Sequence, residues 1–415
     1  MSSDYTIVLL ACQNRLTYPE IISVIVSIHC WKFVKYRHHK YDIEYEIKSI
    51  IMPTKKPENI LIIRLSAIGD VINVLPALRL LRSHFPNARI TWLVEDRASE
   101  ILRDHPDVDE VIIYPRKKWQ SGILKVNKSL NIIAESLSFY KRLRKNHYDL
   151  VIDFQGNLKS AVMNLITGSG DRLGFGKGHC KEFNYLSTKH HAYPAGKKIH
   201  RIEKNLSLLK ELDIETRFLR PELPVSKEDE EYISEFINKK TNPSLPIIII
   251  HPGTSKFGSF KQWSPPNYTL LADMILEKYE ANIIFTWGPD DFGAVEEIIK
   301  NMKHKALPAC ETASINQLIA LIKRATLFIG GDTGPLHIAA IMDIPVVGIY
   351  GPKDPAIYGP YNGNAIVVKK DVPCSPCKKR TCGDPICMTS ILPEDVFCAV
   401  EKLLPIHHQE KDFNK

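Results

Sequence analysis

The feature that most constrains the fold is an alternation of short apolar runs with longer amphipathic segments. It is clearest at residues 325–351, where the apolar run 325–329 meets two glycines, then a segment carrying Pro335, then a second apolar run at 344–350. This order predicts a strand, a turn, a helix opened by Asp332 or Thr333 with proline in its first turn, and another strand. Such units build parallel sheets that are covered by helices.

The amino end of this predicted helix is also suited to a ligand. Backbone N–H groups and the positive end of the helix dipole meet there, and both favour a phosphate or diphosphate. The alternative for an isolated Asp-Thr-Gly segment is an ordinary capped crossover helix with no ligand. Features elsewhere in the chain have to decide between the two.

The alternation occurs twice along the 415 residues, in two halves joined by a proline-containing link. The first half has apolar runs at 59–65, 89–94, 110–114 and 150–154, with helical spacing at 71–84 and 98–104. The second half has runs at 247–251 and 282–287 and predicted helices at 268–279, 294–302 and 315–323. We therefore expect an α/β protein with two doubly wound, Rossmann-like domains whose ligand edges face one cleft.

These patterns also predict where the domains begin and end. Residues 1–51 match nothing that follows, and Met52 is a natural start, so we treat this segment as a doubtful extension. Segment 241–246 is rich in turn-forming residues and follows an acidic helix predicted at 227–239. The predicted division is 52–225 for the first domain, 226–246 for a linker, 247–392 for the second domain and 393–415 for a last helix and a loose tail.

Composition excludes several classes of protein. The 44% hydrophobic and 25% charged residues describe a globular chain. No stretch approaches the ~20 apolar residues that a membrane-spanning helix needs. The first residues also lack the basic start and the cleavage site of a secretory signal. We expect a cytoplasmic protein.

The net charge of +8 is unevenly distributed. Basic residues are dense at 117–145 and again at 172–201. A solvated face explains such runs, and attraction to an anionic small molecule or lipid explains them too. Aromatic residues of the kind that stack bases are sparse there, so we expect no nucleic-acid partner.

The first predicted strand is followed by Ser66, Gly69 and Asp70 at the mouth of the next helix. Asp70 would cap this helix and complement its dipole. A carboxylate at the carboxyl end of a strand also stands where a general base would face the cleft. Both interpretations remain open from these residues alone.

Polar residues follow two strands of the second half as well. After the run at 247–251 come Gly253, Thr254 and Ser255, with Lys261 close behind, and these could bind a diphosphate. The spacing does not fit a nucleoside-triphosphatase phosphate loop, and a plain surface loop is the alternative. Asp290, in the turn after 282–287, would either cap a helix or hold ribose hydroxyls.

Four of the nine cysteines lie within a short segment. Cys374, Cys377, Cys382 and Cys387 could bind zinc or an iron–sulfur cluster, or they could be reduced thiols without a ligand. The second C-x2-C pair that would favour zinc is missing. We therefore expect no metal.

Together these motifs resemble glycosyltransferase family 9, the ADP-heptose:lipopolysaccharide heptosyltransferases. The resemblance extends from about Leu61 to Leu404 and rests on segments that occur in the family's order. They are the stretches 62–71, 76–78, 153–156, 172–175, 251–253, 261–263, 332–340 and 350–352.

The resemblance implies a GT-B fold, with the acceptor on the first domain and the nucleotide sugar on the second. It also implies an inverting, metal-independent transfer of heptose from ADP-heptose, the donor substrate, to the inner core on lipid A. Asp70 falls on the catalytic base, and Ser66, Gly69 and Arg172 on the acceptor side. The donor positions are Thr254, Ser255, Lys261, Asp290, Asp332, Thr333, Gly334 and His337.

Three other functions remain open. The same scaffold could transfer another sugar, or it could host a sugar-nucleotide epimerase, which would need further acids and histidines in the cleft. A non-catalytic nucleotide-binding protein would tolerate the loss of Asp70. With a transferase we expect no cofactor, a monomer, and contact with the cytoplasmic face of the inner membrane, where an anionic lipopolysaccharide precursor would lie.

Overall fold

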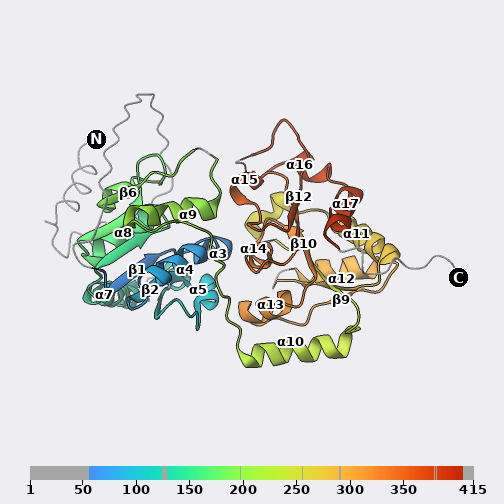
Figure 1. Ribbon diagram of the computed structural model, residues 1–415, viewed down its shortest axis with the longest axis horizontal. Coiled ribbons are helices and arrows are strands. Elements are labelled where there is room, and N and C mark those ends of the chain that lie inside the picture. The colour runs from blue at the N-terminus through green and yellow to red at the C-terminus, as the bar shows by residue number, and fades with distance from the viewer. Residues whose placement is uncertain are drawn as a thin grey trace.

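The structure is a computed structural model that describes residues 56–123, 129–196, 198–254, 256–288, 291–377, 379 and 381–404. The chain forms two α/β halves that lie side by side, the first blue to green and the second yellow-green to red (Figure 1). The predicted extension 1–51 lies outside the described residues.

The first half is built on a six-stranded parallel sheet in the order β3-β2-β1-β4-β5-β6. Its strands are β1 (Asn59–Ile63), β2 (Arg89–Glu95), β3 (Glu110–Tyr114), β4 (Leu150–Asp153), β5 (Asp171–Phe175) and β6 (His190–Ala192). Its helices are α3 (Ile68–Ile72), α4 (Leu75–His84), α5 (Asp96–Ser99), α6 (Arg116–Ile123), α7 (Ser129–Lys145), α8 (Leu158–Thr167) and α9 (Arg201–Leu209). Short 3-10 turns lie at η1 (Glu100–Leu102), η3 (Asn184–Ser187) and η4 (Lys210–Leu212).

The second half repeats this arrangement with a parallel sheet in the order β12-β11-β10-β7-β8-β9. Its strands are β7 (Ile247–His251), β8 (Asn282–Phe285), β9 (Leu307–Pro308), β10 (Leu327–Gly331), β11 (Val346–Ile349) and β12 (Ala365–Val368). Its helices are α10 (Lys227–Lys240), α11 (Pro265–Lys278), α12 (Phe292–Lys300), α13 (Ile315–Ile322), α14 (Gly334–Ile341), α15 (Pro355–Tyr358), α16 (Ile386–Thr389) and α17 (Pro393–Leu403), with a 3-10 turn at η5 (Lys256–Lys261).

Both sheets have the same chain order, because β7 to β12 follow one another as β1 to β6 do. Counted from the first strand of each half, the order is 3-2-1-4-5-6, the doubly wound dinucleotide-fold order. The predicted class, two Rossmann-like parallel sheets, is confirmed. In such sheets the ligand edge lies at the carboxyl ends of the central strands, here β1 with β4 and β7 with β10.

The prediction of one continuous helix at 71–84 is wrong, because the segment holds two helices. It is divided into α3 and α4, and the break falls at Asn73 and Val74. Pro76 lies in the first turn of α4. Because proline has no N–H and its ring clashes with the carbonyl four residues earlier, it is tolerated at the start of a helix and not in its interior. The break leaves α3 as a short helix with its amino end at Ile68.

Two helices near the predicted domain boundaries pack against the second half. The acidic helix predicted at 227–239 is α10, which lies against α13. The last helix, α17, packs against α11 and the strands β11 and β12. Both therefore contribute to the second half rather than standing apart from it, as the yellow-green and red elements of Figure 1 show.

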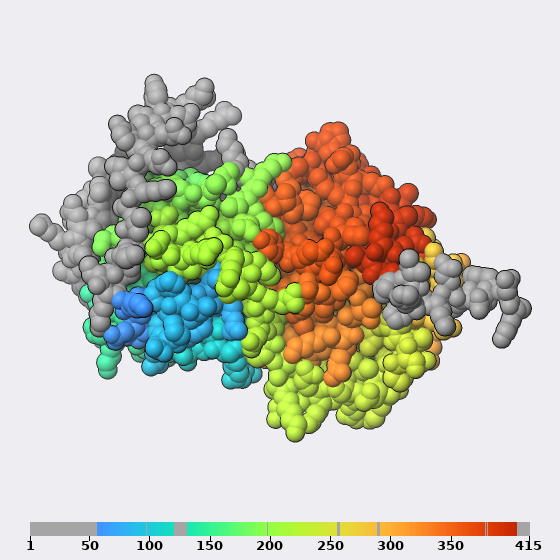
Figure 2. Space-filling view, viewed as in Figure 1, coloured from blue at the N-terminus to red at the C-terminus, as the bar shows by residue number. Residues whose placement is uncertain are grey.

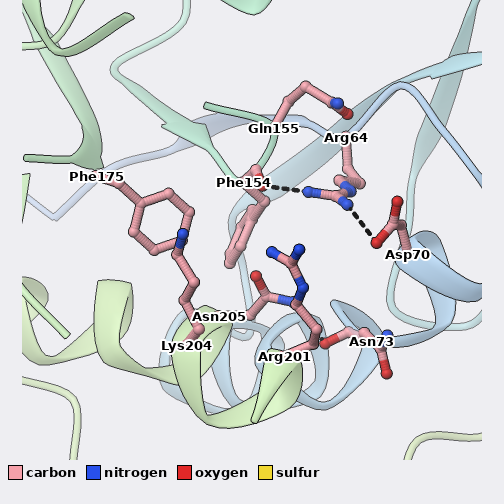
Figure 3. A pocket seen from close by; sticks show the side chains of 9 residues that line it. All are labelled: Arg64, Asp70, Asn73, Phe154, Gln155, Phe175, Arg201, Lys204 and Asn205. Carbon is pink, nitrogen blue, oxygen red and sulfur yellow. Dashed lines mark hydrogen bonds and ion pairs between the residues drawn. The ribbon is translucent and has the colours of Figure 1, made fainter. Parts of the chain in front are cut away.

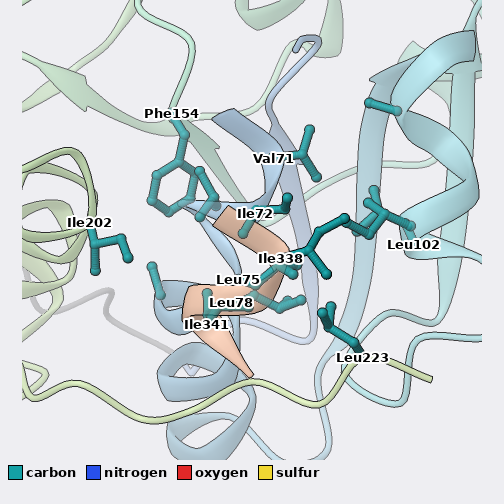
Figure 4. Packing of buried hydrophobic residues seen from close by; sticks show 14 of the residues in the cluster. Val71, Ile72, Leu75, Leu78, Leu102, Phe154, Ile202, Leu223, Ile338 and Ile341 are labelled. Carbon is teal, nitrogen blue, oxygen red and sulfur yellow. The ribbon is translucent and has the colours of Figure 1, made fainter. Parts of the chain in front are cut away.

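The hydrophobic core is continuous between the halves. One cluster of buried residues contains Val71 and Leu75 of the first half together with Ile338 and Ile341 of α14. Figure 4 shows the two α14 side chains among those of α3 and α4. The space-filling view shows the green and orange parts of the chain in contact along their boundary (Figure 2). Apolar burial at this boundary holds the two ligand edges close together.

Candidate active site

The two most informative sequence motifs meet where α3 and α14 contact each other. A Cβ added at Gly69 would lie 3.2 Å from Cδ2 of His337, and one added at Gly334 would lie 3.3 Å from Cγ2 of Ile68. Only glycine at these positions lets the two helix starts approach so closely. The motif predicted to hold the base, with Gly69 and Asp70, therefore lies next to the motif predicted to bind phosphate, with Gly334 and His337.

Asp70 lies in the first turn of α3, and both of its oxygens have partners. Oδ2 accepts the N–H of Ala67 at 3.3 Å, and Oδ1 forms an ion pair with Nη2 of Arg64 at 2.7 Å. The side chain is 40% exposed. Asp70 is thus a helix-capping residue, and its carboxylate also reaches the pocket beside α3 (Figure 3).

This pocket lies at the carboxyl ends of β1, β4 and β5 and is bordered by α9. Its lining consists of Arg64, Asp70, Asn73, Phe154, Gln155, Phe175, Arg201, Lys204 and Asn205. Three of these side chains are basic and one is acidic. The lining therefore has an excess of positive charge, which suits an anionic ligand.

Arg64 lies at the back of the pocket and is only 8% exposed. Its Nη1 donates to the carbonyl of Phe154 at 2.6 Å, which fixes the guanidinium in place. Its Nε is buried and has no hydrogen-bond partner among the described residues. A buried donor without a partner costs about 1–3 kcal/mol, so this nitrogen favours an added acceptor.

Lys204 and Arg201 enter the pocket from α9. Nζ of Lys204 donates to the carbonyl of His179 at 2.6 Å and lies 4.3 Å from the ring centre of Phe175. Burial, together with the positive charges of Arg201 and Arg64, lowers the pKa of Lys204 to about 8. Burial disfavours the charged ammonium, and the neighbouring cations add to this effect.

Arg201 also links the two halves. Its Nη2 donates to the hydroxyl of Tyr358 at 3.0 Å, and its guanidinium carbon lies 4.9 Å from that ring's centre. Beside it, Nε2 of His200 is 3.1 Å from the carbonyl of Gly359. The start of α9 is therefore bound to the second half, and one wall of the pocket depends on this contact.

On the other side of the contact, Asp332 joins Lys261 and His337. Its Oδ2 lies 2.7 Å from Nζ of Lys261, and its Oδ1 lies 3.3 Å from Nε2 of His337. Burial opposes ionisation, but the His337 hydrogen bond and the Lys261 charge hold the pKa of Asp332 at about 2. The carboxylate is therefore ionised at neutral pH and holds the Lys261 ammonium close to α14.

The amino end of α14 is open to an anion. Thr333 is the N-cap residue, but its side chain makes no cap bond and donates instead to the carbonyl of Gly331 at 3.3 Å. Pro335 lies in the first turn, as predicted, and has no N–H to offer. The amides of Gly334 and Leu336 are the first-turn donors that an incoming phosphate would meet.

The loop after β7 begins beside β10, because His251 pairs with Gly330. Nδ1 of His251 lies 3.0 Å from Oγ1 of Thr286, and burial lowers the pKa of His251 to about 4, so this ring is neutral at pH 7. Oγ1 of Thr254 is buried without a partner in the described part of the chain. A Cβ at Gly253 would collide with the carboxylate of Asp291. A side chain at position 253 would therefore require the Asp291 carboxylate to move.

Not every predicted site residue belongs to this region. Ser255 and Asp290 lie outside the described residues. Arg172 donates from Nε to the carbonyl of Ser187 at 2.8 Å and from Nη1 to that of Ser169. In the sheet, Arg172 of β5 pairs with Val151 of β4, and Val151 pairs with Leu61 of β1. Arg172 therefore lies toward the amino end of β5. The structure does not bring Arg172 near Asp70, and its contacts favour a structural role.

The four clustered cysteines show no metal geometry. Cys374 and Cys382 are exposed, Cys377 is half-buried and Cys387 is buried. Burial, and then the nearby thiol of Cys374, raise the pKa of Cys387. Among the described residues, no three His, Cys, Asp or Glu side chains form a group that could hold a metal ion.

The sequence interpretation missed the cations of the pocket. Arg64 was counted as part of the first strand, Arg201 as the end of the basic run 172–201, and Lys204 was not singled out. The one available signal was the density of positive charge at 172–201, which is explained by a solvated face or by an anionic ligand and does not say which residues would meet such a ligand. As a separate finding, none of the helices within the described ranges is long and apolar enough to cross a membrane.

Comparison with known proteins gives consistent results. The sequence profile of glycosyltransferase family 9 (heptosyltransferase) matches residues 136–386. Lipopolysaccharide heptosyltransferase 1 of Pseudomonas aeruginosa is 27% identical over 365 residues, which is 83% of this chain and 98% of that protein. Lipopolysaccharide heptosyltransferase 3 of Escherichia coli K12 is 27% identical over 363 residues, with the same coverage of 83% and 98%.

Solved structures share the fold. A glycosyl transferase of family 9 from Veillonella parvula superposes with a TM-score of 0.70 at 23% identity, covering 83% of this chain and 97% of that one. Escherichia coli heptosyltransferase WaaC with ADP superposes with a TM-score of 0.65 at 21% identity, covering 83% and 99%. The predicted GT-B arrangement of two Rossmann-like domains is the one that these proteins share.

Proposed function

This chain belongs to glycosyltransferase family 9 (heptosyltransferase), and we propose that it transfers heptose from ADP-heptose to the inner core of a lipopolysaccharide precursor. The observation that carries the proposal is the contact of α3 with α14, which places the partly exposed Asp70 beside an open helix start. A base and a diphosphate site are the two parts that sugar transfer from a nucleotide requires.

In the proposed reaction, Asp70 receives the proton of the acceptor hydroxyl. The hydroxyl oxygen forms a bond to the anomeric carbon while the bond from that carbon to the phosphate oxygen breaks, and ADP leaves. Attack from the face opposite to the leaving group inverts the configuration at the anomeric carbon. A positioned base of this kind contributes about 10²–10⁴ to the rate.

The departing ADP gains negative charge, and the second half supplies positive charge for it. The ammonium of Lys261 pairs with Asp332, which lies just before the start of α14 and its first-turn amides. We propose that these groups, with Thr254, Thr333 and His337, bind the diphosphate, and that no divalent metal takes part. Ser255 and Asp290 stay predictions for the same donor site.

The acceptor side follows from the charge of the pocket. Arg64, Arg201 and Lys204 favour an acceptor that carries phosphate or carboxylate groups, as an anionic lipopolysaccharide precursor does. Ser66 and Gly69 lie on the segment that leads to Asp70. We propose that the acceptor binds to the first domain, within 52–225, and the donor to the second, within 247–392.

We further propose that the enzyme acts as a monomer on the cytoplasmic face of the inner membrane. Two aromatic side chains, Phe183 and Tyr193, are 68% and 62% exposed in the basic region 172–201. Aromatic rings with nearby lysines favour an anionic lipid surface. The test is co-sedimentation with vesicles. Binding to anionic and not to zwitterionic vesicles is expected. If the protein binds neither kind of vesicle, peripheral contact is contradicted.

The donor test separates this proposal from its nearest alternatives. Purified protein is incubated with truncated lipopolysaccharide and, in turn, ADP-heptose, UDP-glucose or GDP-mannose, and release of the nucleoside diphosphate is followed. Release from ADP-heptose alone is expected. Release from another donor would assign a different sugar, and conversion of the sugar nucleotide without release would assign an epimerase.

A further inference from the structure

Arg64 connects the predicted base to the cationic pocket. Its guanidinium is held by the Phe154 carbonyl through Nη1 and contacts Asp70 through Nη2. The side chain is nine-tenths buried, and Nε has no partner among the described residues. The guanidinium is thus fixed in orientation, but its Nε–H makes no hydrogen bond to any residue that the structure describes. It can bind a further acceptor.

The neighbours of Arg64 point to the same missing acceptor. Arg201 also has a buried Nε without a partner in the described part of the chain. Lys204 adds a third positive charge, and among the nine lining residues only Asp70 is acidic. An oxyanion, either carboxylate or phosphate, would satisfy both guanidinium groups and balance the charge.

The ion pair with Arg64 occupies one of the oxygens that Asp70 would need to act as a base. One of its oxygens is paired with Nη2 and the other with the Ala67 amide. A carboxylate that must take a proton from the acceptor has to direct an oxygen at the acceptor hydroxyl. Since the side chain is 40% exposed, it has room to turn once Nη2 has another partner.

We propose that Arg64 is a positioning residue that exchanges Asp70 for an oxyanion of the acceptor. Without acceptor, the ion pair with Arg64 occupies the Asp70 carboxylate, so that it does not activate water. When the acceptor binds, its oxyanion takes Nη2 and Nε, and Asp70 turns to the acceptor hydroxyl. This inference rests on the proposed transfer function, and it gives a physical reason for slow hydrolysis of ADP-heptose when no acceptor is bound.

The first test uses the wild-type protein, so that folding is not in question. ADP-heptose hydrolysis is measured alone and with an acceptor whose accepting hydroxyl has been replaced by hydrogen. The side reaction joins water oxygen to the anomeric carbon and gives free heptose, ADP and a proton. The modified acceptor is expected to raise hydrolysis at least about threefold, because it releases Asp70 without consuming the sugar. No rise would overturn the exchange.

Two further acceptors identify the oxyanion. One has its carboxylates reduced to alcohols, and the other has its phosphates removed. The acceptor that lacks the group bound by Arg64 is expected to show KM raised about 10- to 100-fold, which is the loss expected for a buried charge-assisted hydrogen bond. Full affinity of both modified acceptors would overturn the assignment of an oxyanion to Arg64.

The variant Arg64→Met tests the positioning role. Acceptor-independent hydrolysis is expected to rise several-fold and KM for the acceptor to rise at least about tenfold, while kcat at saturating acceptor changes by less than about threefold. Arg64→Lys should restore low hydrolysis in part, since it keeps a cation near Asp70. A merely structural role would lower kcat and leave the ratio of hydrolysis to transfer unchanged, and that result would overturn the proposal.

The matched control is Arg89→Met. Arg89 is 62% exposed and pairs with Glu110 at 3.0 Å, at the beginning of β2. Its loss should leave both hydrolysis and transfer unchanged. Failure of the proposed function is recognised separately, because the wild-type protein would then form no transfer product from ADP-heptose with the unmodified acceptor.

Discussion

The two halves of the molecule share a strand order but differ in how their ligand edges are completed. In the first half, the carboxyl ends of the strands carry a cationic pocket in which buried guanidinium nitrogens have no partner among the described residues. In the second half, the corresponding edge carries Asp332 with its two partners, Lys261 and His337, already in place. The fold alone therefore does not decide what either edge does.

This difference teaches how one architecture serves two substrates. In the proposed function the second half offers the diphosphate a preformed site, because Asp332 fixes the Lys261 ammonium near the start of α14. The proposed acceptor site of the first half is completed by its ligand. The close approach of Gly69 and His337 brings the two edges next to each other.

The largest effect on transfer is expected when the proposed base, Asp70, is replaced. Asp70→Asn keeps the size of the side chain and its contact with the Ala67 amide, but it cannot take a proton at neutral pH. Transfer is expected to fall by about 10²–10⁴, while the dissociation constant of ADP stays the same. Steady-state kinetics and calorimetry measure the two quantities.

The matched control for this variant is Asp371→Asn, since Asp371 is fully exposed and lies 3.8 Å from its Lys369 partner. It should transfer as the wild-type protein does. Turnover of Asp70→Asn close to the wild-type rate would end the assignment of Asp70 as the base.

The second variant, Lys261→Ala, tests the preformed site. It removes a cation from the diphosphate and leaves the ionised Asp332 to repel it. ADP affinity is expected to fall about 10- to 100-fold, as for the loss of a hydrogen bond to a charged group. Lys278→Ala is the control, because Lys278 pairs with Glu401 on α17, outside the site. Unchanged ADP affinity in Lys261→Ala would remove Lys261 from the donor site.

A third variant tests the contact between the halves. In Gly69→Ala the new Cβ would meet the His337 ring at 3.2 Å, so the ring, or α14 with it, must shift by a few tenths of an ångström. We expect transfer to fall about 3- to 10-fold and the free energy of unfolding to fall by about 1 kcal/mol. Gly170→Ala, where a Cβ meets nothing within 4 Å, should change neither quantity. Wild-type transfer by Gly69→Ala would show that this contact does not matter for catalysis.

The smallest expected effect is a pH dependence of the acceptor site. Lys204, with a pKa of about 8, is charged below that pH and neutral above it. An anionic acceptor therefore loses one cationic partner between pH 7 and pH 9, and its KM should rise about threefold to tenfold over that range. Lys204→Arg stays charged throughout and should flatten this rise. An equally steep rise in that variant would assign the titration to another group.

Much of this architecture could be predicted from the sequence. The apolar runs at β1, β2, β7 and β10 are strong enough to predict two parallel sheets, and Thr333 with Pro335 correctly marks the start of α14. Strands β5, β6, β9 and β12 were missed. The segment Asp171–Phe175 begins with two charged residues, and the apolar run Ala365–Val368 is only four residues long, so neither is a strong strand signal.

The pocket was less predictable, for a physical reason. Periodicity shows that a segment such as α9 is helical, but it does not show over which strand edge the helix lies. Lys204 and Asp70 are far apart in the chain and meet only because α9 packs against α4. Arg64 directly follows β1, and nothing in its neighbours reveals that its side chain turns toward Asp70.

The most direct test of the central claim is the mass of the acceptor after reaction. Purified protein, ADP-heptose and truncated lipopolysaccharide are incubated, and the lipid product is analysed by mass spectrometry while ADP is quantified. The account predicts that the acceptor gains a heptose residue for each ADP released. ADP release with an acceptor of unchanged mass, or loss of ADP-heptose without ADP release, would contradict it.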